Sequence, residues 1–94
     1  MKILIACGTG IVCSSIIRMK LEKLCEENSL IPVIDQCSFK EINDHLEDVD
    51  LLLLAADTYE TYPVETVIVY DYLSDNDETA DRNVLEALEK LRNR

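Results

Sequence analysis

The run LLLLA at residues 51–55 contains no polar residue, and it constrains the fold more than any other stretch of the chain. A strand with one face in water alternates apolar and polar residues, whereas a strand covered on both faces is apolar throughout. The run also has the length of a strand. We therefore predict that residues 51–55 form a central strand of a parallel sheet with helices above and below it.

Other apolar runs of strand length alternate with segments of helical period, and this alternation favours an α/β fold. The remaining strands are predicted at residues 2–6, 33–37 and 66–70, and the helices at about 13–28, 39–46 and 80–91. Right-handed crossovers then give an open, four-stranded parallel sheet in the order 2-1-3-4 with helices on both faces, a Rossmann-like or flavodoxin-like architecture. Ligands of such folds bind at the carboxyl ends of the strands where the order reverses, and the loop after the first strand lies there.

Composition and charge limit the class of protein. A chain of 94 residues with few glycines and prolines is expected to form one globular domain, residues 1–94. Residues 1–40 hold five Lys or Arg and four Asp or Glu (+1), whereas residues 41–94 hold four and fifteen (−11). Such an acidic chain is a poor fit for nucleic acid, and no apolar run is long enough to insert in a membrane. We expect a cytoplasmic monomer without a cofactor, whose partners are proteins or a small ligand.

The segment CGTGIVCSS at residues 7–15 places a cysteine at the start of a glycine-containing turn between a strand and a helix. Backbone N–H groups of such a turn converge on one centre and the helix dipole adds positive charge, so the turn attracts an anion of phosphate size. These groups also favour a thiolate, which makes Cys7 a candidate nucleophile. The predicted phosphate-binding loop comprises the eight residues that follow it: Gly8, Thr9, Gly10, Ile11, Val12, Cys13, Ser14 and Ser15.

Other chemistries fit this loop less well. A dinucleotide loop needs a third glycine and a Walker loop ends in Gly-Lys-Ser/Thr, and neither pattern occurs. The cysteines at positions 7, 13, 25 and 37 lack the spacing of a zinc site, so we expect no metal. A redox role for Cys7 stays open as an alternative, because thiolate character also favours oxidation. A phosphatase of the low-molecular-weight tyrosine type is a second alternative, but its arginine six residues after the cysteine is replaced here by Cys13, which weakens support for hydrolysis.

Four short stretches carry a resemblance to a known family: ACG at 6–8, the serine pair at 14–15, IPV at 31–33 and QC at 36–37. Together they resemble the enzyme IIB components of the bacterial phosphoenolpyruvate-dependent sugar phosphotransferase system (PTS), in particular the galactitol-type branch, which is related to the lactose and ascorbate types. The resemblance implies a fold related in shape to the low-molecular-weight tyrosine phosphatases. It also implies that Cys7 accepts a phosphoryl group from a phosphohistidine of a IIA protein. Cys7 then passes the group to a sugar, galactitol or a related polyol, held by the membrane protein IIC, with which the chain associates peripherally.

Some residues near the loop are further candidates for framing a phosphoryl group or contacting a partner. Arg18 is the nearest basic side chain of the first predicted helix. Asp57, Thr58 and Tyr59 follow the central strand and are expected at the same edge of the sheet as the cysteine. The acidic stretch at residues 71–81 is predicted to be a solvated turn.

The remaining polar and sulfur-containing residues are predicted to be structural. Cys25 and Cys37 lie on apolar faces and are expected in the core. His45 is expected at the surface, because no second histidine accompanies it. Ser38 and Glu41 have the spacing of a capping box at the start of the helix predicted over 39–46.

Overall fold

The computed structural model describes residues 1–8 and 11–93, and for residues 11–13 it describes the backbone alone. It contains one parallel sheet in the order β2-β1-β3-β4, which confirms the predicted topology. The strands are β1 (Lys2–Cys7), β2 (Val33–Ser38), β3 (Leu51–Leu54) and β4 (Glu65–Ile68). The helices are α1 (Ile11–Glu27), α2 (Ile42–His45) and α3 (Asp77–Arg92), with 3-10 turns η1 (Phe39–Glu41) and η2 (Tyr70–Tyr72).

The two central strands are buried on both faces, as the leucine run predicts. In β1 and β3, alternate residues point to opposite sides of the sheet and enter two different apolar clusters. The α1/α3 cluster contains, among others, Ile3, Ile5, Cys7, Leu51, Leu53, Ile17, Leu21, Val84 and Leu88. The α2 cluster contains Leu4, Ala6, Ile42, Val49, Leu52 and Leu54. All four leucines of β3 are therefore core residues, two for each face.

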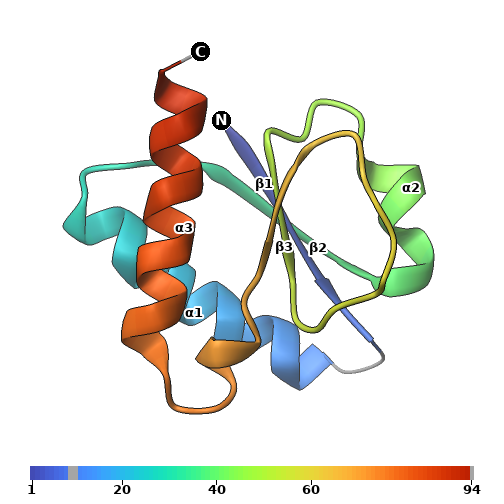
Figure 1. Cartoon of the computed structure of the whole chain (residues 1–94), viewed down its shortest axis with the longest axis horizontal. Coiled ribbons are helices and arrows are strands. Elements are labelled where there is room, and N and C mark those ends of the chain that lie inside the picture. Colours follow the sequence, from blue (N-terminus) through green and yellow to red (C-terminus); the bar gives the residue numbers. More distant parts are fainter. Residues whose placement is uncertain (9–10, 94) are drawn as a thin grey trace.

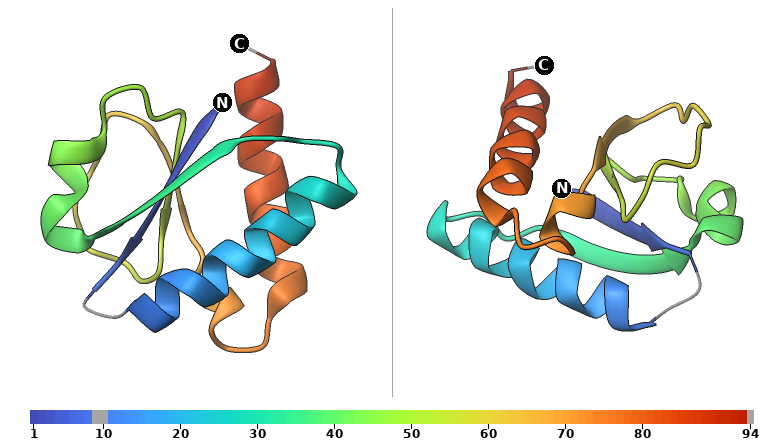
Figure 2. Two further views of the ribbon diagram at one scale, coloured as in Figure 1. Left: turned by 180° about the vertical axis from the view of Figure 1, so that it is seen from behind. Right: turned by 60° about the horizontal axis from the view of Figure 1, so that its bottom comes forward.

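The two faces of the sheet are covered unequally. Helices α1 and α3 lie side by side on one face (Figures 1 and 2). Among the described residues, the other face carries η1, α2 and the connection at residues 55–64, except that its first residue, Ala55, packs in the α1/α3 cluster. This connection joins β3 to β4 without a helix, and its Tyr62 and Val64 pack against the α2 cluster. We call α1 and α3 the thick layer, and η1, α2 and residues 55–64 the thin layer.

The segment between β4 and α3 differs from the prediction. The strand predicted at residues 66–70 ends at Ile68, and Tyr70–Tyr72 form the 3-10 turn η2. Tyr72 is fully buried in the α1/α3 cluster, so the expectation of a solvated turn across residues 71–81 is wrong for this tyrosine. Burial of a large aromatic ring has overridden the polar character of its neighbours.

Helix boundaries also shift by a few residues. The first helix begins at Ile11 rather than at residue 13, and the last begins at Asp77 rather than at residue 80. Asp77 and Glu78 in the first turn of α3 favour the earlier start, because carboxylates stabilise the positive end of a helix. The helix predicted over residues 39–46 is divided into η1 and α2. None of the described helices combines the length and the apolar content needed to span a bilayer.

Candidate functional site

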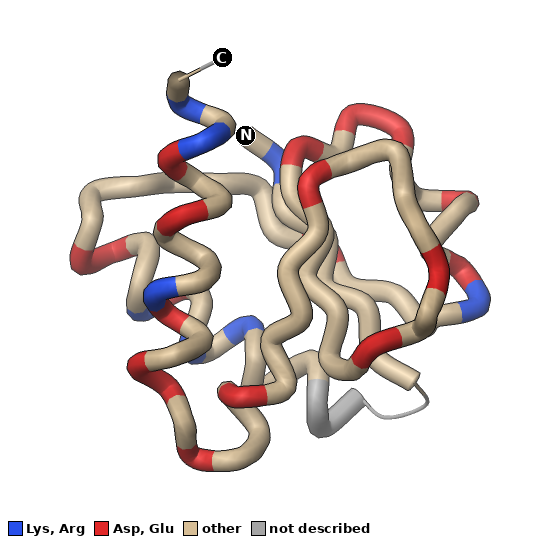
Figure 3. The backbone as a smooth tube through the Cα atoms, in the orientation of Figure 1, with Lys and Arg blue, Asp and Glu red and all other residues tan. Residues whose placement is uncertain are grey.

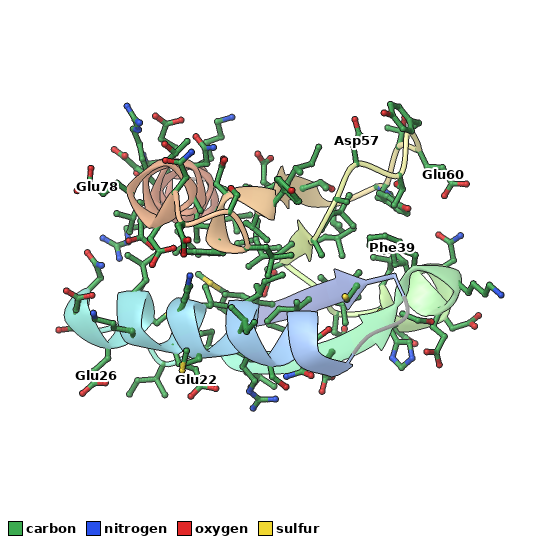
Figure 4. The ribbon with its side chains drawn as sticks, turned by 90° about the horizontal axis from the view of Figure 1, so that it is seen from below. Glu22, Glu26, Phe39, Asp57, Glu60 and Glu78 are labelled. Carbon is green, nitrogen blue, oxygen red and sulfur yellow. The ribbon has the colours of Figure 1, made fainter. Side chains whose placement is uncertain are left out.

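The carboxyl ends of the four strands meet at one edge of the sheet, and Cys7 is the last residue of β1 at this edge. The strand order reverses here, since β1 lies between β2 and β3 and the chain leaves it toward α1. Figure 4 looks onto this edge, which is the lower edge in Figure 1. Doubly wound sheets bind their ligands at such a position, and that the loop after β1 does so here stays a prediction.

Cys7 lies at the border between the core and this edge. Its exposed fraction is 6%, and it belongs to the α1/α3 cluster as a free cysteine. Gly8, the next residue, is exposed and does not have the positive φ that would require glycine. A Cβ atom added at Gly8 would lie 3.7 Å from Cε2 and 3.9 Å from Cδ2 of Phe39, so the ring of Phe39 borders the start of the loop.

The rest of the predicted phosphate-binding loop is only partly described. Thr9 and Gly10 lie outside the described residues, and so do the side chains of Ile11, Val12 and Cys13. The backbone of these last three residues forms the first turn of α1. Ser14 is buried and Ser15 is exposed on the same helix. The loop is therefore joined to a helix N-terminus, where backbone N–H groups lack partners within the helix.

Asp57, Thr58 and Tyr59 follow β3, as predicted, and they form hydrogen bonds within their own loop. A carboxylate oxygen of Asp57 accepts a bond from the Tyr59 N–H at 2.8 Å. The hydroxyls of Thr58 and Tyr62 are 2.9 Å apart. Tyr59 has a φ of 58° and its side chain is 92% exposed. The hydrogen bonds found in this part of the chain keep the loop in shape, and none of them joins it to Cys7 or Gly8.

Arg18 lies on α1, where its Nε donates to Oε1 of Glu22 at 2.8 Å. This ion pair holds the guanidinium along the helix surface. Arg18 also lines a groove of about 530 Å³ beside the edge strand β2, a feature that sequence reasoning missed. The other lining residues are Glu22, Cys25, Glu26, Ser29, Leu30, Ile31, Pro32 and Ile34. Because Cys7 and Gly8 do not line this groove, we place the site by the strand order and not by the groove.

Carboxylates surround the carboxyl edge of the sheet. Asp57 and Glu60 lie on one side of the edge and Glu78 on the other (Figure 4). The sequence between residues 41 and 81 holds no Lys or Arg, and Figure 3 shows the resulting concentration of acidic residues.

Lys20 neutralises part of this acidic region. Its Nζ donates to the carbonyl oxygen of Tyr72 at 2.6 Å and to Oδ1 of Asp77 at 2.8 Å. Tyr72 in turn donates from its hydroxyl to Asp81 at 2.6 Å. Burial, followed by this bond to Asp81, raises the pKa of Tyr72 far above its usual value. Sequence reasoning missed this network because its members are about fifty residues apart.

Cys25 and Cys37 are structural thiols. Cys25 is buried, as predicted, and burial with a contribution from Glu22 raises its pKa. Cys37 is half-buried, and its pKa is raised to about 11 by burial, Glu41 and Asp35. Both thiols stay protonated at neutral pH, which makes them poor nucleophiles. His45 is exposed, as predicted, and no three His, Cys, Asp or Glu side chains of the described residues form a group that could hold a metal ion.

Comparison with known proteins points to one family. Residues 2–82 match the family model described as "PTS system, Lactose/Cellobiose specific IIB subunit". The chain is also 33% identical over 66 residues to the Escherichia coli (strain K12) protein named "Putative phosphotransferase enzyme IIB component SgcB". This similarity covers 70% of the chain and 72% of the relative.

Proposed function

We propose, from the premise that this chain belongs to the lactose/cellobiose-specific IIB subunit family of the PTS, that Cys7 is the residue that carries the phosphoryl group. Membership of this family makes the chain a component of a sugar phosphotransferase system. To this family membership the proposal adds the residue that carries the phosphoryl group, the direction in which the group is transferred, and the partner proteins.

The observation that carries the proposal is the place of Cys7. It ends β1 at the carboxyl edge of the sheet, and α1 begins a few residues later. A phosphocysteine is close to doubly charged and needs several hydrogen-bond donors, which a helix N-terminus supplies. Because the thiol is 6% exposed, the phosphoryl group would lie toward the loop and α1, outside the core.

The proposed reaction has two transfer steps. In the first, the thiolate of Cys7 attacks the phosphorus of a phosphohistidine on a IIA protein, so that an S–P bond forms and the N–P bond breaks. In the second, a hydroxyl of a sugar bound to the membrane protein IIC attacks the phosphorus, so that an O–P bond forms and the S–P bond breaks. Cys7 leaves as the thiolate, and the proton of the hydroxyl is released. A loose phosphoryl-transfer transition state needs positioning more than acid or base groups, and this suits a short loop at the edge of a sheet.

The sugar is proposed as a class. The sequence resemblance favours galactitol or a related polyol, whereas the matching family model is described as specific for lactose and cellobiose. The chemistry common to both is a sugar hydroxyl presented by IIC, and the carrier needs no sugar-binding pocket of its own for such a transfer.

Labelling with a phosphorylated IIA protein tests the proposal. The expected result is one label per chain on Cys7, released by iodine, which cleaves the S–P bond. Cys7→Ser loses the label, and the matched control Cys13→Ser keeps it, because serine at position 13 leaves the acceptor thiol intact.

Two results would overturn the carrier function. A label that requires both Cys7 and Cys13 would favour the redox alternative. Continuous turnover of an aryl phosphate by the chain alone would favour the phosphatase alternative.

A further inference from the structure

We propose that the ring of Phe39 is a wall of the Cys7 site that limits the access of water to the sulfur atom. The geometry of this wall is independent of the proposed function. Its consequence, protection of a phosphocysteine from hydrolysis, depends on the function proposed above.

The register of the sheet brings Phe39 to the cysteine. Cys7 of β1 is the partner of Ser38 of β2, and these are the last residues of the two strands. The next residues, Gly8 and Phe39, are therefore neighbours at the carboxyl edge. A Cβ atom added at Gly8 would be in ordinary van der Waals contact with the ring, at 3.7 and 3.9 Å, so the ring faces the first residue of the loop across a space of about one methyl group.

Phe39 is held in this place by its own turn. The carboxylate of Glu41 accepts hydrogen bonds from the hydroxyl of Ser38 at 2.8 Å and from its backbone N–H at 3.3 Å. These bonds lower the pKa of Glu41, with the bond from the hydroxyl as the largest cause. The Ser38 hydroxyl thus stabilises the turn η1 through its hydrogen bond to Glu41. The ring of Phe39, the first residue of this turn, faces Gly8.

The environment of the ring distinguishes it from an ordinary core residue. Phe39 is half-buried and packs against both the α1/α3 cluster, which contains Cys7, and the α2 cluster. Phe39, Asp57 and Glu60 lie on the same side of the carboxyl edge (Figure 4). We infer that an apolar ring beside Gly8 reduces the amount of water next to Cys7.

The chemical benefit concerns a competing reaction. In hydrolysis, the oxygen of water attacks the phosphorus, the S–P bond breaks, and inorganic phosphate leaves while Cys7 returns to the thiolate. This reaction wastes the phosphoryl group before a sugar receives it. Fewer water molecules beside the sulfur would slow this hydrolysis.

Alkylation tests the wall without any phosphoryl donor. Iodoacetamide reacts with the folded chain, and peptide mapping follows the modification of Cys7. We expect Phe39→Ala to raise the rate of alkylation of Cys7 several-fold and Phe39→Leu to raise it less.

The matched control is Leu46→Ala, which removes a half-buried side chain that packs against the α2 cluster alone. No rise in Phe39→Ala, or an equal rise in Leu46→Ala, overturns the wall. If Phe39→Ala does not fold, the comparison of Phe39→Leu with Leu46→Ala decides.

A second measurement separates the wall from the proposed function. After labelling by phosphorylated IIA, we expect the label to decay several-fold faster in Phe39→Ala than in the wild type or Leu46→Ala. Equal decay in all three chains overturns the protective role of Phe39 and leaves the carrier function standing. A faster alkylation of Phe39→Ala in a chain that never accepts the label overturns the carrier function and leaves the wall standing.

Discussion

Cys37 shows how one buried thiol links pH to stability. Its pKa in the folded chain is about 11, whereas the ordinary value is 9.0. Burial is the largest cause, and the carboxylates of Glu41 and Asp35 add to it. The folded state therefore favours the neutral thiol, and the unfolded chain releases this proton at a lower pH.

The sign of the effect follows from this raised pKa. Below pH 9 the thiol is neutral in both states, and the full stabilising contribution of Cys37 is present. As the pH rises from about 9 to 11, the unfolded chain ionises first and this contribution is lost. We expect urea titrations to show a shallower loss of stability across this range for Cys37→Ala than for the wild type. Equal slopes would show that the thiol does not titrate differently in the two states.

Only some of the residues of the candidate site could be predicted from the sequence. The position of Cys7 follows from the strand order, because parallel strands place their carboxyl ends at one edge. Phe39 did not stand out in the sequence, since a phenylalanine at the start of a short helix is typical of a core residue. Its position beside Gly8 depends on the register between β1 and β2, which the apolar pattern of the strands does not determine.

At the scale of elements, Lys20 joins α1 to the segment that precedes α3. It bonds to the carbonyl of Tyr72 in η2 and to the carboxylate of Asp77 at the start of α3. Its side chain is 22% exposed, so the ion pair with Asp77 is less screened than a fully exposed one. The ion pair between Lys20 and Asp77 thus connects the two helices of the thick layer in addition to their apolar packing.

Substitution of this lysine should weaken the thick layer. We expect Lys20→Met to lower the free energy of unfolding by about 1–2 kcal/mol, because a partly buried carbonyl and a carboxylate lose a charged donor. Lys23→Met, on the exposed side of the same helix, is the control and should change it by no more than about 0.5 kcal/mol. Urea denaturation at low salt measures both, and equal effects would contradict a specific role for Lys20.

The elements themselves were largely visible in the sequence. The alternation of apolar runs and helical segments predicted all four strands and their order, and in the central strands β1 and β3 burial on both faces leaves a continuous apolar run. The turn η2 was missed because Asp71 and Ser74 flank Tyr72 and make the stretch resemble a surface loop. Its burial depends on contacts with α1 and α3, which local sequence does not encode.

At the scale of the whole molecule, the charge of −10 is the dominant property. Figure 3 shows that the Asp and Glu positions are spread over both layers and outnumber the Lys and Arg positions. Like charges in a compact chain repel each other, and this repulsion lowers the stability of the folded state at low ionic strength.

Added salt should therefore stabilise the chain. We expect the free energy of unfolding to rise by roughly 1 kcal/mol between 20 mM and 300 mM NaCl, because the Debye length shortens below the spacing of many carboxylates. Asp75→Asn removes one exposed charge and keeps a residue suited to the positive φ of 61° at this position. This variant should be slightly more stable than the wild type at 20 mM and equal to it at 300 mM. A fall in stability with NaCl would show that local ion pairs outweigh the overall repulsion.

The unequal thickness of the two layers affects where the sequence of such a chain can change during evolution. The thick layer supplies two long helices to the core, so a change of length there would disrupt packing over much of the sheet. In the thin layer, residues 55–64 cross the sheet as an irregular segment that contributes mainly Tyr62 and Val64 to the α2 cluster. Irregular surface segments tolerate insertions and substitutions at small cost. Descendants of one ancestral chain can therefore acquire new surfaces on the thin layer, beside the cysteine, while the thick layer preserves the fold.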